Sequence, residues 1–187
     1  MGNGNMLHPD RLLPEDPRTR DIARELYGSV RSLPIISPHG HTDPAWFAEN
    51  KPFGNPAELL ITPDHYVFRM LYSKGITLDQ LGITGTSDSR KSITDPRAVW
   101  RLFASNYHLF RATPSRIWLD HVFFEIFDFD VPLSGDTSDV YFDRIQALLG
   151  TEEFLPRHLF DKFNIELLAT TESPLDELIH HNTIIAS

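Results

Sequence analysis

The stretch Leu33-Pro-Ile-Ile-Ser-Pro-His-Gly-His-Thr-Asp-Pro44 decides the fold. Its short apolar run followed by His39 and His41 is typical of the carboxyl end of a buried β-strand. Side chains at positions i and i+2 of a strand point to the same face, so both imidazoles can converge on one metal ion. Solvent-exposed or structurally hydrogen-bonded histidines are the alternative, because this spacing is only moderately specific. The segment predicts a parallel β/α fold and metal-assisted chemistry.

A second segment, Asn164-Ile-Glu-Leu-Leu-Ala-Thr-Thr171, also has the pattern of a buried strand. Each strand follows a predicted helix, and this alternation predicts parallel strands covered by helices. A β/α repeat of an eight-stranded barrel takes about 30 residues, but the sequence between these two strands is several times longer. The expected fold class is therefore α/β, as the N-terminal portion of a TIM (β/α)8 barrel with a large helical insertion after strand 1.

The expected organisation has three parts. Residues 1–44 would hold an N-terminal helix and barrel strand 1, residues 45–160 the helical insertion, and residues 161–187 barrel strand 2 and the start of the following helix. Two parallel strands cannot close a barrel, and the sequence stops within a predicted helix. We therefore expect it to be the N-terminal part of a longer protein.

Helix starts are marked by a cap residue followed by proline at the first helical position. The pattern recurs at Asp16-Pro17, Asn55-Pro56, Thr62-Pro63, Asp95-Pro96, Thr113-Pro114 and Ser173-Pro174. The first helix is expected to present Ile22, Leu26 and Val30 on one face. Two aromatic-rich helices are predicted at roughly 96–109 and 114–127, and a further one at 138–149.

The composition excludes several classes of function. The formal net charge of −9 argues against a nucleic-acid partner, because phosphate binding requires a basic surface. No apolar run approaches the roughly 20 residues that span a bilayer, so no membrane partner is expected. The absence of cysteine leaves histidine and carboxylates as metal ligands. Without the charged and apolar regions of a signal peptide, a cytoplasmic location is the default expectation.

The segment Thr62-Pro-Asp-His-Tyr66 places His65 and Tyr66 in the first turn of a predicted helix. The positive end of a helix favours a neutral imidazole and a developing tyrosinate, so both side chains could serve proton transfer. A surface histidine and a half-buried tyrosine are the alternative. Asp43 could orient a metal-bound imidazole, although a turn residue before Pro44 is the simpler interpretation.

Three other positions offer weaker candidates. His121 lies on a helix that also supplies core aromatic residues. Glu172 follows the second strand, at the edge where barrel enzymes place functional groups, and it could instead be a partner of the next helix N-terminus. His180 and His181 are expected to be exposed on the closing helix, where adjacent positions cannot face one ligand.

Three separated motifs resemble the uronate isomerase (glucuronate isomerase) family over about residues 20–187. They are Leu33-Pro-Ile-Ile-x-x-His-x-His, Asp64-His-Tyr followed by Arg69-Met and Gly75, and Thr170-Thr-Glu-Ser-Pro-Leu-Asp-Glu-Leu178 with its following His-His pair. The sequence departs from the family in having Gly40 between the two histidines, where cysteine is frequent, and Thr171-Glu172 in place of the more usual Thr-Asp. Gly40 is expected to face away from the histidines.

The resemblance implies an amidohydrolase-like, metal-dependent (β/α)8 barrel that interconverts D-glucuronate with D-fructuronate and D-galacturonate with D-tagaturonate. By motif, His39 and His41 resemble the two metal ligands, and His65 and Tyr66 resemble catalytic and substrate-binding residues. The implied cofactor is a divalent metal ion, zinc with manganese or another ion as alternatives, and the implied partner is a hexuronate. The family's third protein ligand and its substrate arginines would lie beyond Ser187. Whether a homo-oligomer forms stays open.

Two other functional hypotheses remain beside the isomerase. Many barrels with the same histidine pair are metal-dependent hydrolases, so hydrolysis of an ester or amide is one alternative. A non-catalytic segment, whose strands need partners before they are stable, is the other. Neither alternative is separated from the isomerase by composition or spacing.

Overall fold

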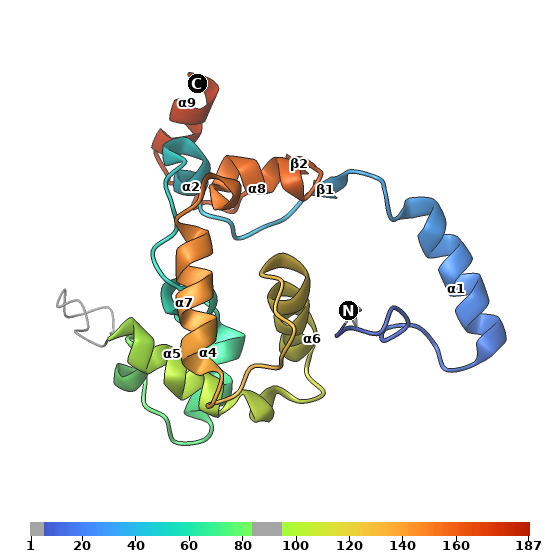
Figure 1. Cartoon of the computed structure of the whole chain (residues 1–187). Helices are drawn as coiled ribbons and strands as arrows, with labels where there is room; N and C mark the ends of the chain where they lie inside the picture. The colour runs from blue at the N-terminus through green and yellow to red at the C-terminus, as the bar shows by residue number, and fades with distance from the viewer. Residues whose placement is uncertain (1–5, 84–94) are drawn as a thin grey trace. The chain divides into compact units, whose positions relative to one another are not determined.

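The computed structural model describes residues 6–83 and 95–187, which form two compact units (Figure 1). The first unit comprises Met1–His8 with Phe53–Leu149, and the second comprises Pro9–Pro52 with Gly150–Ser187. The two units are described separately below. The domain boundaries expected from the sequence stay a prediction.

Every element of regular secondary structure in the described residues of the first unit is helical. It contains α3 (Pro56–Leu60), α4 (His65–Tyr72), α5 (Pro96–Ser105), α6 (Pro114–His121) and α7 (Ser138–Leu149), with short helical turns η1 (Asp79–Leu81) and η2 (Tyr107–Phe110) and the π-helical turn η3 (Val122–Ile126). The predicted helix at 138–149 is confirmed. The helix predicted over 114–127 is regular only to His121, after which the backbone widens into η3.

Aromatic side chains form the core of the first unit. Trp100, Phe103, Tyr107, Phe123 and Tyr141 are all essentially inaccessible to solvent. The ring centroid of Phe123 lies 6.1 Å from that of Trp100 and 5.3 Å from that of Tyr141. Both pairs are in edge-to-face arrangements, which aromatic quadrupoles favour. The aromatic-rich helices predicted from the sequence therefore meet in one core.

Polar contacts join α5 to α7 both inside and outside this core. The indole nitrogen of Trp100 donates to the carbonyl of Ser138 over 2.9 Å, which satisfies two buried polar groups. On the surface, Arg101 makes two 2.9 Å hydrogen bonds to the carboxylate of Asp139. These bonds hold the pKa of Asp139 below its usual value. Hydrogen bonds therefore join the two helices both in the core and on the surface.

Tyr107 keeps its proton within the core. Burial raises the pKa of Tyr107, and the negative charge of Asp120 raises it further. The hydroxyl donates to Asp120 over 2.9 Å, and Arg116 pairs with the same carboxylate at 2.7 Å. This tyrosine is a structural donor that ties η2 to α6.

The second unit contains the sheet. Its elements are α1 (Pro17–Val30), β1 (Ile35–Ser37), α2 (Pro44–Glu49), η4 (Glu152–Phe154), α8 (Pro156–Lys162), β2 (Ile165–Leu168) and α9 (Ile179–Ile185). The strands pair in parallel, with Ile35 opposite Ile165 and Ser37 opposite Leu168. The predicted parallel pairing of the two segments is confirmed, although both strands are shorter than expected.

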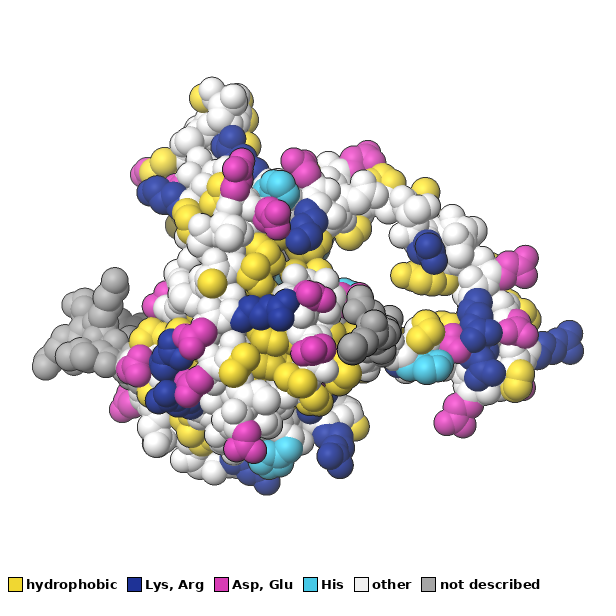
Figure 2. Space-filling model, viewed as in Figure 1, with side chains coloured by type: hydrophobic (Ala, Val, Ile, Leu, Met, Phe, Trp, Pro, Cys, Tyr) yellow, Lys and Arg dark blue, Asp and Glu magenta, His cyan; other side chains and the backbone are white. Residues whose placement is uncertain are grey.

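The strands are not buried, contrary to the sequence prediction. Ile35, Ile36 and Leu167 are 50%, 60% and 48% exposed. The apolar face of α1 is also exposed, with Leu26 at 65%, and charged and hydrophobic side chains share its surface (Figure 2). Within the second unit, α8 contacts β2, but these strand side chains remain largely open to solvent.

Cap geometry explains most of the helix starts. Asp16, Asn55, Asp95 and Thr113 each accept a backbone N–H from the first turn of the helix that they precede, as predicted. Two predicted starts are wrong, since α4 begins after Asp64 rather than Thr62, and no helix begins at Ser173-Pro174. In the described part of the chain, no helix has both the length and the apolar character needed to cross a membrane.

Replacing Trp100 with alanine should lower the free energy of unfolding by about 3–5 kcal/mol, because the substitution leaves a cavity and removes the donor to the Ser138 carbonyl. Urea unfolding followed by circular dichroism measures the change. Trp118→Ala is the matched control, since Trp118 is 38% exposed and should cost less than half as much. Equal losses in both variants would contradict the central place of Trp100.

Candidate functional site

The two histidines after β1 lie side by side. Their Nε2 atoms are 3.2 Å apart, and the rings meet nearly at right angles, with centroids separated by 4.9 Å. Both side chains are exposed. The convergence of His39 and His41 expected from their spacing is therefore observed, while their role as metal ligands stays a prediction.

Hydrogen bonds from β2 and its following loop hold the segment that carries this pair. The amide of Ala169 donates to the carbonyl of Ser37 over 2.8 Å, and the hydroxyl of Thr171 donates to the carbonyl of Gly40 over 2.7 Å. Within the segment, the Ser37 hydroxyl donates to the carbonyl of His39 over 3.1 Å. The backbone on both sides of His39 is thus tied to the neighbouring strand end.

Gly40 allows β2 to approach this backbone closely. A Cβ atom at Gly40 would lie 2.9 Å from the carbonyl oxygen of Ala169. The position faces β2, so a larger side chain here requires one of the two strand ends to move. A Cβ at Gly40 would thus point towards the end of β2 and not towards either histidine ring, in agreement with the expectation that this position faces away from the pair.

A polar cavity of about 300 Å³ adjoins His41. Its wall is built from the loop after β1 and the segment that joins β2 to α9. The lining residues are His41, Thr42, Asp43, Pro44, Thr171, Glu172, Ser173, Asp176, His180 and His181. Asp43 is the N-cap of α2 and accepts the amide of Ala45 over 2.8 Å, which confirms its interpretation as a turn residue.

His181 is half-buried rather than exposed, which corrects the sequence prediction for the His180-His181 pair. Its Nε2 atom lies 2.9 Å from the hydroxyl of Thr170 and 3.5 Å from Oε1 of Glu172. That Oε1 atom is buried and has no hydrogen-bond partner. Because α9 begins at Ile179, Glu172 is not a helix N-terminal residue, which rules out the alternative expected from the sequence.

A larger cavity of about 540 Å³ shares His181 and Pro44 with the smaller one. It is mainly apolar, with Phe47, Phe160 and Leu168 among its lining residues. Its one arginine, Arg157, donates to the carbonyl of Phe47 over 2.8 Å and so joins α8 to α2. The smaller cavity is the better candidate site, since three carboxylates and three histidines, His41 among them, line it.

The other predicted site residues, His65 and Tyr66, belong to the first unit. They begin α4, and Asp64 caps this helix by accepting the amides of Tyr66 and Val67 over 2.8 and 3.2 Å. Their rings lie 4.2 Å apart between centroids. Tyr66 is 66% exposed rather than half-buried. The structure places this pair together at one helix start, with both rings accessible.

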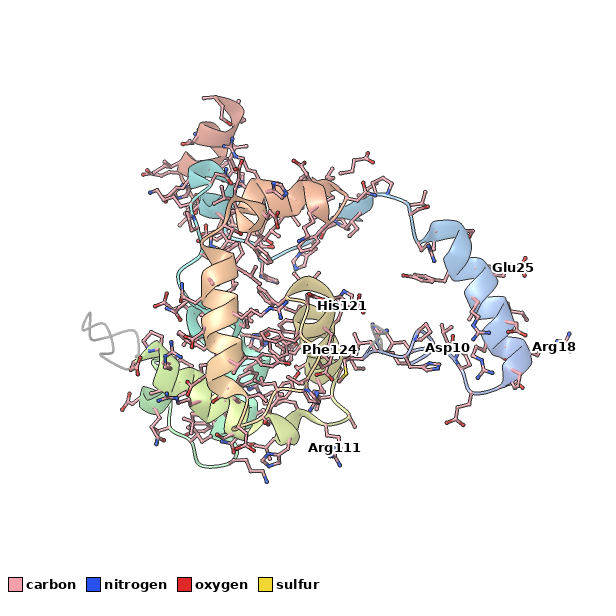
Figure 3. All side chains as sticks on the ribbon, viewed as in Figure 1. Asp10, Arg18, Glu25, Arg111, His121 and Phe124 are labelled. Atoms are coloured by element: carbon pink, nitrogen blue, oxygen red, sulfur yellow. The ribbon has the colours of Figure 1, made fainter. Side chains whose placement is uncertain are left out.

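His121 is exposed at the end of α6, where η3 begins (Figure 3). No group of three histidine or carboxylate side chains within residues 6–83 and 95–187 is arranged to hold a metal ion. The candidate centre in the described chain therefore consists of His39 and His41 alone.

Comparison with known proteins decides the family. Residues 13–187 match the family model of glucuronate isomerase. The chain belongs to the glucuronate isomerase family. It is 65% identical over 181 residues to a uronate isomerase of Sphingopyxis alaskensis, covering 97% of this chain and 37% of that protein. A uronate isomerase of Xanthomonas euvesicatoria is 63% identical, with 97% and 38% covered.

Solved structures of the family share the fold. The crystal structure of glucuronate isomerase from Caulobacter crescentus matches with a TM-score of 0.93 and 56% identity, over 97% of this chain and 37% of that chain. A uronate isomerase from Thermotoga maritima matches with a TM-score of 0.81 at 24% identity, which shows the fold alone. The chain thus spans somewhat more than a third of the length of these relatives.

Sequence reasoning missed two contacts of this family member's candidate site. The bond from Thr171 to Gly40 and the contact between Thr170 and His181 both join residues distant in sequence. The position of Thr170 and Thr171 at the end of the second strand was the available signal, because parallel strand ends meet at one edge of a sheet.

Replacing Thr171 with valine should loosen the histidine segment, because valine keeps the volume but cannot donate to the Gly40 carbonyl. We expect a loss of about 1 kcal/mol in local stability, measured as roughly fivefold faster amide hydrogen exchange around His41. Thr171→Ser retains the donor and should exchange like the parent protein. Unchanged exchange in Thr171→Val would contradict the role of this bond.

Proposed function

We propose that this chain is the N-terminal portion of a uronate isomerase that interconverts D-glucuronate with D-fructuronate and D-galacturonate with D-tagaturonate. Membership of the glucuronate isomerase family and relatives named uronate isomerase support this proposal. The structural observation that carries it is the converging pair His39 and His41 at the carboxyl end of β1. The complete protein would be a metal-dependent TIM barrel of the amidohydrolase type, with residues 45–160 inserted after strand 1.

The histidine pair fits a divalent metal ion. Two imidazole nitrogens bound tetrahedrally to zinc at about 2.0–2.1 Å are separated by about 3.3 Å. The Nε2 atoms of His39 and His41 are 3.2 Å apart, so both rings could bind one ion with little movement. Imidazole suits zinc and the neighbouring first-row metals, which agrees with a chain without cysteine. A further carboxylate ligand would come from residues beyond Ser187.

The reaction transfers hydrogen between neighbouring carbons. The aldose loses the C2 proton and the proton of the C2 hydroxyl, and the ketose gains one proton at C1 and one on the C1 oxygen. A bound divalent metal would stabilise negative charge on these oxygens in the enediolate. In this proposal His39 and His41 hold the ion, while His65 and Tyr66 bind substrate and serve the proton transfers. We assign neither residue specifically as the acid or as the base.

The substitution pair His39→Ala and His41→Ala, made in the complete protein, should abolish metal retention and isomerisation together. Both imidazole ligands are removed, so no more than a trace of bound metal should remain after gel filtration. Elemental analysis and conversion of glucuronate to fructuronate are the two measurements. Full turnover in the double variant would end the isomerase mechanism proposed here.

The variant Tyr66→Phe should lower kcat by about 10²–10⁴-fold with bound metal unchanged, because only the hydroxyl that serves proton transfer is removed. Since Tyr66 is 66% exposed, the substitution should have little effect on folding. His121→Gln, at an exposed histidine of the same unit, should leave kcat within twofold of the parent value. A Tyr66→Phe enzyme with normal kcat would remove this residue from the mechanism.

Hydrolysis remains the outcome that would replace this proposal. Release of product from an ester or amide panel, without uronate isomerisation, would assign the same histidine pair to a hydrolase. The 187-residue chain alone is expected to be inactive, since it supplies two imidazoles to the proposed centre. The cytoplasmic location expected from the sequence stays a prediction.

A further inference from the structure

The polar cavity beside His41 is negatively charged. Its lining includes the carboxylates of Asp43, Glu172 and Asp176, and no lysine or arginine is among the described residues that form it. Such a wall repels a ligand carboxylate, whereas neutral hydroxyl groups can donate hydrogen bonds to its oxygens. The lining is therefore suited to the hydroxyl groups of a polyhydroxy compound.

Most of the polar groups in this wall already hold the local fold. Asp43 accepts the amide of Ala45 over 2.8 Å, and Asp176 accepts the amide of Leu178 over 2.7 Å. The hydroxyl of Thr171 donates to the carbonyl of Gly40. These side chains position the backbone around the cavity, so their hydrogen-bonding capacity is partly used.

Glu172 is different, because no backbone group of the described chain is hydrogen-bonded to its carboxylate. Oε1 is buried 3.5 Å from Nε2 of His181, whose ring is held by Thr170. The side chain as a whole is 19% exposed and lines the cavity. With Oε1 turned towards His181, Oε2 is the oxygen available to a ligand hydroxyl.

The position of the cavity relates it to the reacting end of the substrate. His41 belongs both to the cavity wall and to the histidine pair at which C1 and C2 react in the proposed isomerisation. In a hexuronate, C3 to C5 carry hydroxyl groups and separate the reacting carbons from the C6 carboxylate. A volume of about 300 Å³ is small for a whole ligand site and adequate for part of one.

We propose that this cavity is the hydroxyl-binding subsite of the enzyme, with Glu172 as a substrate-binding residue and His181 as the residue that positions it. This assignment rests on the isomerase function proposed above and adds the orientation of the bound substrate. The substrate places its middle hydroxyl groups against Glu172, and its carboxylate lies outside this cavity.

The test uses the complete protein and two probes that separate hydroxyl from carboxylate recognition. Mannitol has six hydroxyl-bearing carbons and no carboxylate, while succinate has carboxylates and no hydroxyl groups. Isothermal titration calorimetry gives the Kd of each. We expect Glu172→Gln to raise the mannitol Kd by about tenfold or more and to leave the succinate Kd unchanged or lower. His181→Gln should weaken mannitol binding by a smaller factor.

Kinetics with glucuronate provide a second readout. Loss of a binding contact in Glu172→Gln should raise KM more than it lowers kcat, with metal content unchanged. Glu153→Gln is the matched control, because Glu153 is an exposed residue of η4 outside the cavity and loses the same charge. This control should bind mannitol like the parent protein.

Several results would overturn the subsite. They are a parent protein that does not bind mannitol, a Glu172→Gln variant that binds mannitol within twofold of the parent, and a loss of succinate binding in place of mannitol binding. Isomerase activity with mannitol binding independent of Glu172 would refute the subsite alone. Mannitol binding that depends on Glu172 in a protein without isomerase activity would refute the proposed function and leave the subsite standing.

Discussion

The parallel pairing of β1 with β2 is the constraint on which the candidate site depends. Parallel strands bring their carboxyl ends to the same edge of a sheet, so the histidines after β1 meet the polar residues after β2. The amide of Ala169 donates to the carbonyl of Ser37. Further along the two segments, the hydroxyl of Thr171 donates to the carbonyl of Gly40. A Cβ at position 40 would lie 2.9 Å from the carbonyl oxygen of Ala169, so glycine permits this close approach between the two segments.

Helix-cap patterns in the sequence correctly predicted those helix starts that depend only on neighbouring residues. Four predicted caps are observed, but the same cap-proline pattern failed at Thr62 and Ser173. The hydroxyl of Thr62 donates to the carbonyl of Ala57 over 3.1 Å, and Asp64 takes the cap with bonds to two amides. Ser173 accepts the amide of Leu175 over 3.3 Å in a turn, and α9 starts only after Leu178 in the left-handed region. In such cases, competing hydrogen-bond acceptors a few residues away determine where the helix begins.

The convergence of the histidine pair was predicted from its strand-like i and i+2 spacing. His39 and His41 do meet, although they lie beyond Ser37, the last residue of β1, where regular strand geometry no longer applies. The half-buried state of His181 depends on a loop that turns α9 back towards Thr170, and no periodicity encodes that contact. Burial of the strands was also predicted from their apolar sequence, whereas burial is a property of the layers around a strand.

Different interactions stabilise the two units. In the first unit, α5 and α7 enclose an aromatic core, and polar bonds such as that of Trp100 add to close packing. In the second unit, full burial of an isoleucine such as Ile36 would contribute about 1.5–3 kcal/mol, and at 60% exposure most of this is not gained within the described chain. The placement of the histidine pair therefore relies on the hydrogen bonds from Thr171 and Ala169.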